Sequence, residues 1–236
     1  MNIALLLSGG NGSRVGVNIP KQYINVGGKM IITYSLEILI SHEMINAIHV
    51  VTDMTWQEAI LQEAAQYNIN TSKISGFSEP GENRQLSIFN GLRDIKEYAE
   101  KDDLVLIHDA ARPLLSKSQI TDCFNAVYGH DGAMPVLPMK DTVYLSHNGV
   151  NVSGLLDRTS IFAGQAPEVF RLEKYYKANL DLLPERILSI NGSTEPAILN
   201  GLDVVIIPGL EENFKITTRR DLERFQNIVL TQQKNK

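Results

Sequence analysis

The chain has 236 residues, and its 22 Lys+Arg against 27 Asp+Glu give a formal net charge of −5. Hydrophobic residues make up 43% and charged residues 21% of the sequence, a balance that is typical of globular proteins and excludes a disordered chain. The acidic balance removes the electrostatic reason to expect nucleic acid as a partner, so an anionic ligand would need a locally basic pocket.

The first half of the sequence alternates predicted strands with predicted helices. Ile3–Leu7 is a continuous apolar run before a glycine-rich loop, as expected for a strand that is buried on both faces. Similar short runs predict strands at Ala47–Val51 and Leu104–Ile107. Helical periodicity or helix-favouring composition predicts helices over residues 31–40, 56–67, 84–100 and 119–128. This order favours a mostly parallel, doubly wound (Rossmann-like) α/β sheet, in which ligands bind beyond the carboxyl ends of the strands.

The pattern changes after Asp141. In the segment 142–152, β-prone residues lie on both sides of Asn148-Gly149, which predicts a β-hairpin. We interpret residues 140–158 as a β-arm inserted into the α/β unit. After the arm, the sequence predicts a helix near 172–182, strands at 203–207 and 213–216, and a final helix from about 219 to 230. No internal repeat or low-complexity segment is visible, so we expect one domain over residues 1–236.

Cysteine usage and the start of the sequence bear on the compartment. Cys123 is the single cysteine, so it cannot close an internal disulfide, and the sequence has no Cys/His cluster with zinc spacing. No apolar run approaches 18 residues, and the run Ile3–Leu7 lacks the basic flank and the length of a signal peptide. We therefore expect a cytoplasmic protein with no membrane partner.

The first chemical signal is the run Leu7-Ser8-Gly9-Gly10-Asn11-Gly12-Ser13-Arg14. Three glycines in four residues let backbone N–H groups converge on an anion. Arg14 can then grip a phosphate through its planar fork, and Lys21 can act as a point charge. The Walker A ending is absent, and Val15 occupies the third glycine position of the dinucleotide-binding fingerprint. The alternative interpretation is a plain glycine-rich turn.

The second signal is Ile107-His108-Asp109-Ala110-Ala111-Arg112-Pro113. An acid at the carboxyl end of a buried strand suits Mg²⁺, which prefers one or two carboxylates together with phosphate oxygens. Arg112 is placed to meet phosphate charge. The alternative is structural, with Asp109 capping the next turn and Arg112 forming a local salt bridge.

With these two signals, further motifs give the chain a resemblance to the CTP-dependent cytidylyltransferases that act on 2-C-methyl-D-erythritol 4-phosphate or ribitol 5-phosphate. The motifs occur in family order and span residues 4 to 225, nearly the whole chain. Each is weak alone, and together they are specific. They are the Gly9–Arg14 loop, Pro20-Lys21-Gln22, Gly81-Glu82-Asn83-Arg84 with Ser87, His108–Pro113, Lys140-Asp141-Thr142, Asp157-Arg158, Gly164-Gln165-Ala166-Pro167 and Asn213-Phe214-Lys215-Ile216-Thr217.

The resemblance implies a nucleotidyltransferase sheet and a role for each matching motif. The implied catalytic residues are Arg14, Lys21, Lys215 and Asp109. CTP would contact Leu7, Ser8, Gly9, Gly10, Asn11, Gly12, Ser13, Gly81, Glu82, Arg84, Ser87 and Ala110. The acceptor would contact Arg112, Lys140, Thr142, Arg158, Ala166, Ser193 and Thr194. Mg²⁺, or another divalent cation, would be held by Asp109 and Glu212.

The resemblance also implies a homodimer, in which the arm embraces a second subunit and carries Thr142 and Arg158 to that subunit's active site. The acceptor phosphate is already nucleophilic, so the protein has to align two anions and stabilise the departing pyrophosphate. His108, Ser13 and Cys123 lack the context of a hydrolytic triad.

Two departures from the family pattern bear on the acceptor. Ala166 stands where the family usually has Thr, and Ser193-Thr194-Glu195-Pro196 where it usually has Thr-Asp-Glu or Thr-Asp-Ala. These departures favour ribitol 5-phosphate or a related polyol phosphate over 2-C-methyl-D-erythritol 4-phosphate. Two other functions remain as alternatives: an NAD(P)-binding α/β oxidoreductase, with Asp53 as the acid that closes the second strand, and a non-catalytic nucleotide-binding protein.

Overall fold

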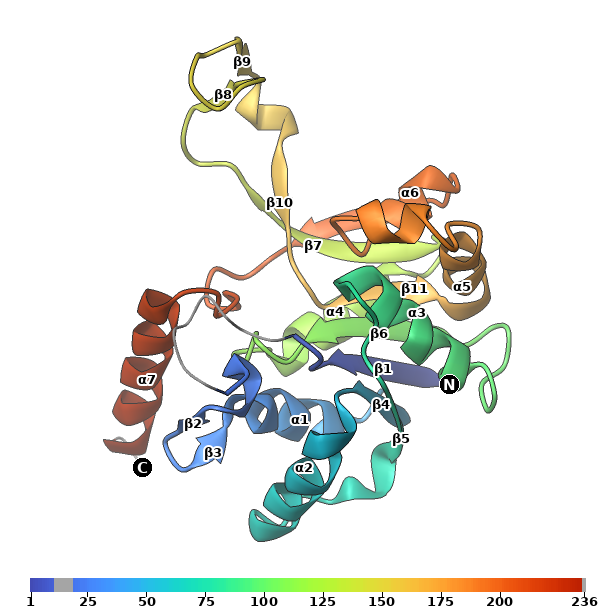
Figure 1. Ribbon diagram of the computed structural model, residues 1–236, viewed down its shortest axis with the longest axis vertical. Coiled ribbons are helices and arrows are strands. Elements are labelled where there is room, and N and C mark those ends of the chain that lie inside the picture. The colour runs from blue at the N-terminus through green and yellow to red at the C-terminus, as the bar shows by residue number, and fades with distance from the viewer. Residues whose placement is uncertain (11–18, 235–236) are drawn as a thin grey trace.

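A mixed eight-stranded sheet forms the centre of the computed structural model, which describes residues 1–10 and 19–234 (Figure 1). Strand β1 (Asn2–Leu7) lies between β4 (Ala47–Val51) and β6 (Leu104–Asp109) and is parallel to both. Strand β5 (Ile74–Ser78) adds to β4, also in parallel. The mostly parallel sheet predicted from the sequence is confirmed.

The other half of the sheet contains the antiparallel strands. Strand β11 (Glu168–Arg171) is antiparallel to both β6 and β7 (Gly132–Pro138), and it separates these two strands. Strand β10 (Phe162–Gly164) is antiparallel to the second half of β7, while β12 (Val204–Pro208) is parallel to β7. The sequence predicted β12 but not β5, β7, β10 or β11.

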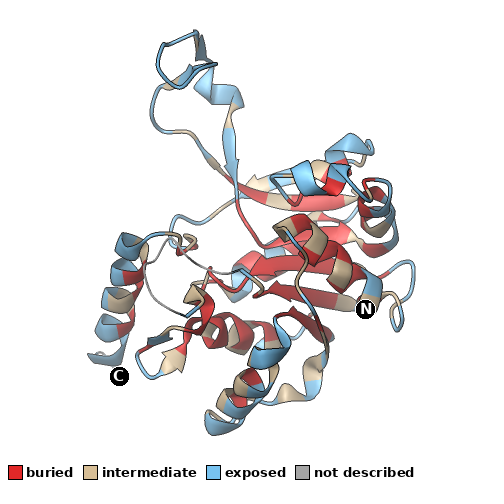
Figure 2. Ribbon diagram, viewed as in Figure 1, coloured by how far each residue is buried: buried red, intermediate tan, exposed pale blue. Residues whose placement is uncertain are grey.

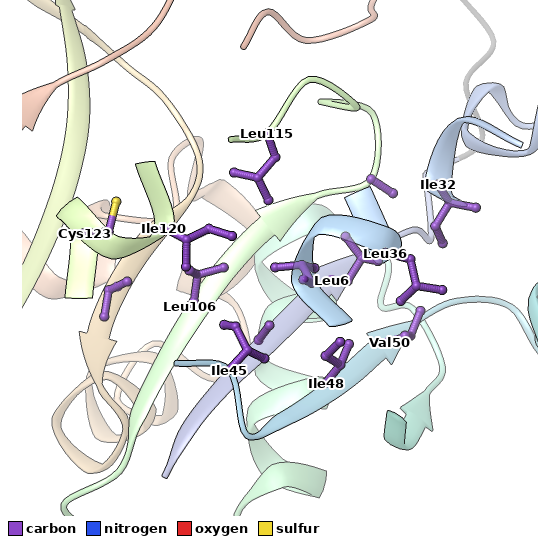
Figure 3. Close-up of a cluster of buried hydrophobic side chains, with 14 of the residues drawn as sticks. Leu6, Ile32, Leu36, Ile45, Ile48, Val50, Leu106, Leu115, Ile120 and Cys123 are labelled. Carbon is purple, nitrogen blue, oxygen red and sulfur yellow. The ribbon is translucent and has the colours of Figure 1, made fainter. Parts of the chain in front are cut away.

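Helices pack on both faces of the sheet, and the side chains of β1 show why its sequence is apolar throughout. Leu6 belongs to a cluster with Leu36 of helix α1 (Ile31–Ser41) and Ile120 of helix α4 (Lys117–Ala126), and Figure 3 shows this cluster. Leu5 points to the other face and clusters with Ile88 of helix α3 (Arg84–Ile95) and Tyr175 of helix α5 (Leu172–Leu180). Figure 2 shows the central strands as buried. The α-helices are α1 (Ile31–Ser41), α2 (Met54–Gln66), α3 (Arg84–Ile95), α4 (Lys117–Ala126), α5 (Leu172–Leu180), α6 (Glu195–Leu199) and α7 (Arg219–Lys234).

The predicted arm is present, and it projects away from the sheet (Figure 1). Its strands β8 (Val143–Leu145) and β9 (Gly154–Leu156) pair antiparallel as a separate two-stranded sheet. The predicted β-hairpin is confirmed, and Asn148-Gly149 lies in the loop 146–153 that joins its two strands. Gly149 has a φ of 71°, and Asn148 Oδ1 accepts from the backbone N–H of residues 150 and 151, so the pair turns the tip of that loop.

Two further predictions are corrected by the structure. The predicted strand at 213–216 is absent, since these residues lie in a segment without helix or strand between β12 and α7. The helix predicted over 84–100 ends at Ile95, and turns follow it. The remaining short elements are β2 (Asn25–Val26), β3 (Lys29–Met30) and single-turn 3-10 helices at Lys21–Tyr23, Thr71–Lys73, Arg158–Ser160 and Arg186–Ser189.

None of the helices in the described residues combines the length and the apolar character needed to cross a membrane.

Candidate functional site

A cavity of about 620 Å³ opens beyond the carboxyl ends of β1 and β6. This is the place where open α/β sheets bind their ligands, because the loops that follow the parallel strands converge there. Segments from distant parts of the sequence line the cavity. The lining residues are Leu7, Ser8, Gly9, Gly10, Lys21, Gln22, Pro80, Gly81, Glu82, Asn83, Arg84, Ser87, Asp109, Ala111, Lys215 and Thr217.

Asp109, the last residue of β6, is surrounded by cations in this cavity. Its Oδ1 accepts from Arg84 Nε at 3.0 Å, and its Oδ2 accepts from Lys215 Nζ at 2.8 Å. Arg112 Nε lies 3.9 Å from the same Oδ2. Three cations around one carboxylate leave a net positive charge, which suits a polyanionic ligand.

These charges shift one another's pKa values. Burial by itself would raise the pKa of Asp109, but Arg84 and Lys215 outweigh burial and hold the pKa of this carboxyl well below its usual range. Burial opposes the charged form of Arg84, while Asp109 and Glu168 favour it and raise its pKa. Asp109 is therefore ionised and Arg84 is cationic across the ordinary pH range.

The strand-to-loop transition after β1 is held by side chains from the 3-10 helix Lys21–Tyr23. Gln22 Nε2 donates to the backbone oxygen of Gly10 at 2.9 Å. The Tyr23 hydroxyl donates to the backbone oxygen of Ser8 at 2.9 Å. Buried side chains thus fix the first residues of the glycine loop at the mouth of the cavity.

The loop before α3 also lines the cavity, and it ends in a helix cap. Asn83 is the N-cap residue, and its Oδ1 accepts from the backbone N–H of Leu86 at 2.8 Å. Ser87 Oγ accepts from the backbone N–H of Gly81 at 2.9 Å. The cap directs Arg84, in the first turn of the helix, toward Asp109.

Most of the sequence-predicted catalytic and CTP-binding residues lie together in this cavity. Asn11, Gly12, Ser13 and Arg14 lie outside the described residues. Ala110 is fully buried, and its neighbour Ala111 lines the cavity instead. The sequence-predicted residues that line the cavity are Leu7, Ser8, Gly9, Gly10, Lys21, Gly81, Glu82, Arg84, Ser87, Asp109 and Lys215.

Five further residues line the cavity and had no individual assignment from the sequence. Four of them belong to the motifs that carried the family resemblance, which was the signal that could have identified them. Pro80 lies just before one of those motifs. The five residues are Gln22, Pro80, Asn83, Ala111 and Thr217.

The residues expected to bind the acceptor are not part of the cavity lining. Lys140, Thr142 and Arg158 lie on the exposed arm, where Arg158 Nη1 donates to the backbone oxygen of Lys140 at 2.7 Å and Lys140 pairs with Glu211. Arg112 is partly buried beside the cavity, and its Nη1 donates to the backbone oxygen of Asn213.

The other three expected acceptor contacts are buried. Ala166 is packed in the interior, where its backbone oxygen accepts from Asn213 Nδ2 at 2.7 Å. The hydroxyls of Ser193 and Thr194 both donate to the buried carboxylate of Glu168. Burial is the main cause of the raised pKa of Glu168. The structure therefore gives Ser193 and Thr194 an internal partner instead of a position on the cavity wall.

The cavity offers few side chains that could bind a metal ion. Glu212 is exposed and does not line the cavity, so the structure does not bring it to Asp109. Within the described ranges, no group of three or more His, Cys, Asp and Glu side chains could hold a metal ion by itself. Asp109 fits Mg²⁺ as a lone carboxylate, provided that the phosphates of a nucleotide supply further oxygen ligands.

Asp53, the residue that kept an oxidoreductase open, has a structural role. Its Oδ1 accepts from the backbone N–H and the hydroxyl of Thr55, at 2.9 and 2.6 Å, and so caps α2. Its side chain lies at an exposed helix start and is absent from the cavity lining.

Comparisons with known proteins agree with this geometry. The chain is 34% identical over 238 residues to a ribitol-5-phosphate cytidylyltransferase from Vibrio parahaemolyticus, covering 99% of this chain and 98% of the relative. A protein with the same name from Streptococcus agalactiae serotype III is 32% identical over 230 residues, with coverages of 97% and 95%. A 2-C-methyl-D-erythritol 4-phosphate cytidylyltransferase from Geobacillus thermodenitrificans is 31% identical, with coverages of 93% and 92%.

The solved structures show the same fold. The crystal structure of 2-C-methyl-D-erythritol 4-phosphate cytidylyltransferase from Francisella tularensis aligns with a TM-score of 0.79 and 26% identity, covering 95% of this chain and 99% of that chain. The sequence profile of the family described as "IspD: 2-C-methyl-D-erythritol 4-phosphate cytidylyltransferase" matches residues 2–231. On these matches, and on the cationic cavity at the carboxyl end of its sheet, the chain belongs to the IspD family of cytidylyltransferases.

Proposed function

We propose that the protein transfers CMP from CTP to a polyol phosphate and releases pyrophosphate, with ribitol 5-phosphate as the first candidate acceptor and 2-C-methyl-D-erythritol 4-phosphate as the second. The observation that carries the proposal is the grouping of Arg84 and Lys215 on Asp109 inside the cavity. It provides fixed cationic groups where a triphosphate would lie. The family match supports cytidylyl transfer over the oxidoreductase alternative.

The chemistry requires little beyond positioning. An oxygen of the acceptor phosphate attacks the α-phosphorus of CTP, a P–O bond forms there, and the bond to the β-phosphate oxygen breaks with its electron pair leaving on pyrophosphate. Attacking and leaving groups are both anionic, so the barrier falls when cations offset their repulsion. Lys21 and Lys215 line the cavity and supply such charge, and Arg14 completes the set in the proposal.

We include Mg²⁺ as a cofactor that enters with the nucleotide. Asp109 would provide its carboxylate, and CTP phosphate oxygens would provide further ligands. The ion supplies Lewis-acid stabilisation of charge on the phosphates when it is bound. Arg84 and Lys215, which share Asp109, would orient that carboxylate.

We also propose that the arm joins two copies of the chain. Its apolar side chains are exposed, with Tyr144 at 61%, Val152 at 69% and Leu155 at 67% of their surfaces accessible. Such a group on a projecting element is typical of an interface. A dimer would explain why Thr142 and Arg158 lie away from the cavity of their own chain, because each could serve the cavity of the other copy.

The choice of acceptor rests on relatives whose names include both candidates. The relatives named for ribitol 5-phosphate are 34% and 32% identical to this chain, against 31% for the relative named for 2-C-methyl-D-erythritol 4-phosphate, and this supports placing ribitol 5-phosphate first. The pathway would accordingly be surface-polymer synthesis, with isoprenoid-precursor synthesis as the second candidate. We expect the enzyme to act in the cytoplasm, since its single cysteine suits a reducing compartment.

The experiment is a parallel acceptor assay on the full chain. Pyrophosphate release and product mass are measured with CTP, Mg²⁺ and each polyol phosphate, and then with ATP, GTP or UTP in place of CTP. We expect turnover with CTP, and a higher kcat/KM for ribitol 5-phosphate than for 2-C-methyl-D-erythritol 4-phosphate. The variant D109N should be inactive and serves as the control. Preference for 2-C-methyl-D-erythritol 4-phosphate reverses the order of acceptors, and turnover without CTP overturns the nucleotide assignment.

A further inference from the structure

The segment 209–217 carries Lys215 into the cavity without forming a helix or strand of its own. Lys215 lies between Asn213 and Ile216, and both of these residues have no exposed surface. A lysine side chain is long and flexible, so the position of its ammonium depends on how firmly the backbone beneath it is held. The contacts of this segment therefore determine where the charge lies.

Gln165 holds the start of this segment through both ends of its carboxamide. Its Nε2 donates to the backbone oxygen of Leu210 at 3.0 Å, and its Oε1 accepts from the backbone N–H of Leu210 at 3.0 Å. The Gln165 backbone N–H donates to Pro135 of β7 at 2.8 Å, which fixes the glutamine itself. Only 6% of Gln165 is exposed, so water competes little for these bonds.

Gly209 leaves the room that this carboxamide occupies. A Cβ at position 209 would lie 2.5 Å from Gln165 Oε1, so another residue there would push the carboxamide away. The Gly209 backbone N–H donates to the oxygen of Val136 at 2.8 Å. Gly209, Gln165 and Leu210 thus form one clamp, which we call the amide clamp.

Two further contacts tie the clamped segment to the cavity. Arg112 Nη1 donates to the backbone oxygen of Asn213 at 2.7 Å. The backbone N–H of Ile216 donates to the oxygen of Ala111 at 2.8 Å. The backbone is therefore held on both sides of Lys215 by hydrogen bonds to residues close to Asp109. The amide clamp holds the residues that precede these two attachments.

We propose that Gln165 is a positioning residue for Lys215: its clamp on Leu210 holds the segment that presents the Lys215 ammonium to the phosphates of the nucleotide. Gln165 does not line the cavity, so it acts through the segment and not by contact with the ligand. The identity of the ligand rests on the proposed function. The clamp requires a carboxamide at position 165, outside the cavity, and this requirement can be tested by mutation.

The test is a double-mutant cycle on CTP affinity, measured by calorimetry with Mg²⁺ and without acceptor. K215M should weaken CTP binding about tenfold or more, because it removes a charged hydrogen-bond donor. Q165L should weaken binding by less, and Q165L in the K215M background should add nothing, since no ammonium remains to be positioned. A Q165L penalty of equal size in both backgrounds would show that the glutamine only supports the fold, and it would overturn the proposal.

Two further variants sharpen the test. L210A removes the side chain but keeps both backbone partners of Gln165, so its CTP affinity should stay within about twofold of wild type. G209A displaces the carboxamide from the other side and should reproduce Q165L, also without further effect in K215M, and it replaces Q165L if that variant fails to fold. A loss in L210A equal to that in Q165L would contradict the clamp.

The cycle separates this proposal from the proposed function. A wild-type protein that binds CTP and transfers nothing to any acceptor contradicts the proposed function, while the binding cycle still decides the role of Gln165. A wild-type protein that binds no CTP overturns both.

Discussion

Lys215 Nζ donates to Asp109 Oδ2 at 2.8 Å, although the two residues are 106 positions apart in the sequence. The other carboxylate oxygen accepts from Arg84. The charges that a triphosphate would meet are therefore held in place by contacts within the protein. Catalysis by fixed charges gains from such preorganisation, because the groups need not rearrange during the reaction.

Replacing Lys215 tests the contribution of this charge to the reaction. We expect K215M to lower kcat by about 10²–10³, the usual cost of removing one preorganised group that stabilises transition-state charge. Asp109 keeps Arg84 as its partner, so the fold should survive. The measurement is steady-state pyrophosphate release at saturating CTP and acceptor, with circular dichroism to check folding.

Lys96 provides the matched control for Lys215. Lys96 also forms an ion pair, with Glu173, but it does not line the cavity. K96M should therefore leave kcat unchanged. A K215M rate close to that of K96M would contradict the role of Lys215.

The contacts of Ser193 predict an effect on stability instead of acceptor binding. S193A removes one of the hydroxyls that donate to Glu168, and a buried carboxylate that loses a donor costs about 1–3 kcal/mol of unfolding free energy. The acceptor KM should not change, because Ser193 does not line the cavity. Urea unfolding and acceptor titration measure the two quantities.

The control for S193A is a serine on the surface. Ser189 Oγ donates to the backbone oxygen of Arg186 in an exposed turn, so S189A should change stability by no more than about 0.5 kcal/mol. If S193A instead raised the acceptor KM and left stability unchanged, the sequence-based assignment of Ser193 to the acceptor would be restored.

Arg158 on the arm should affect the two substrates differently. If the arm reaches a second copy, R158A should raise the acceptor KM about tenfold or more, the usual loss of a charged hydrogen bond, and change the CTP KM much less. The kinetic constants for both substrates give the answer. R219A, at an exposed ion pair on α7, serves as the control and should alter neither constant. A larger effect of R158A on CTP would mean that the arm serves the nucleotide.

The apolar side of the arm predicts the oligomeric state. L155D places a charge on a strand that is exposed in the single chain, so it should leave the fold intact and disrupt association between arms. Light scattering after gel filtration should give half the wild-type mass, and acceptor turnover should be lost. The control is L180D, because Leu180 is exposed on α5, away from the arm. A monomeric wild-type protein would remove the dimer from the proposal.

The sequence predicted the elements whose signal is local. Strands β1, β4 and β6 are buried on both faces, so their residues are apolar without alternation and stand out in the sequence. Strand β5 contains Ser75 and Gly76 and lies at the edge of the sheet, so it has no such run. The insertion of β11 between β6 and β7 depends on pairing between distant segments, which no local pattern contains.

The segment 213–216 shows why a correctly predicted pattern of burial can lead to a wrong prediction of secondary structure. Asn213 and Ile216 are buried, as in a strand, but separate hydrogen bonds to Ala166 and Ala111 hold them. Among the described residues, no strand pairs with the segment. The partner of Ser193 could not be predicted for a similar reason, because Glu168 lies in a distant strand. The location of Gly9, Gly10 and Asp109 in one cavity could be predicted because their signals lie in contiguous residues at the ends of two apolar strands.

His108 predicts a decline in stability on the acid side. Burial lowers its pKa to about 4, against about 6.5 in an unfolded chain, and Asp109, Arg112 and Arg84 modify that shift. As the pH falls, His108 therefore takes up a proton in the unfolded chain before it does so in the folded protein. The stability that neutral His108 contributes is fully present above pH 6.5 and is lost as the pH falls toward 4. Burial also lowers the pKa of His49, which adds to the same decline.

H108Q should flatten this decline, because glutamine keeps a donor for the backbone oxygen of Arg112, which lies 3.1 Å from His108 Nε2, but does not titrate. The measurement is the free energy of unfolding between pH 8 and pH 4. H147Q, at an exposed position on the loop of the arm, should keep the wild-type slope. Equal slopes for H108Q and wild type would mean that the protons taken up in this range bind elsewhere, and His49 would be the next residue to replace.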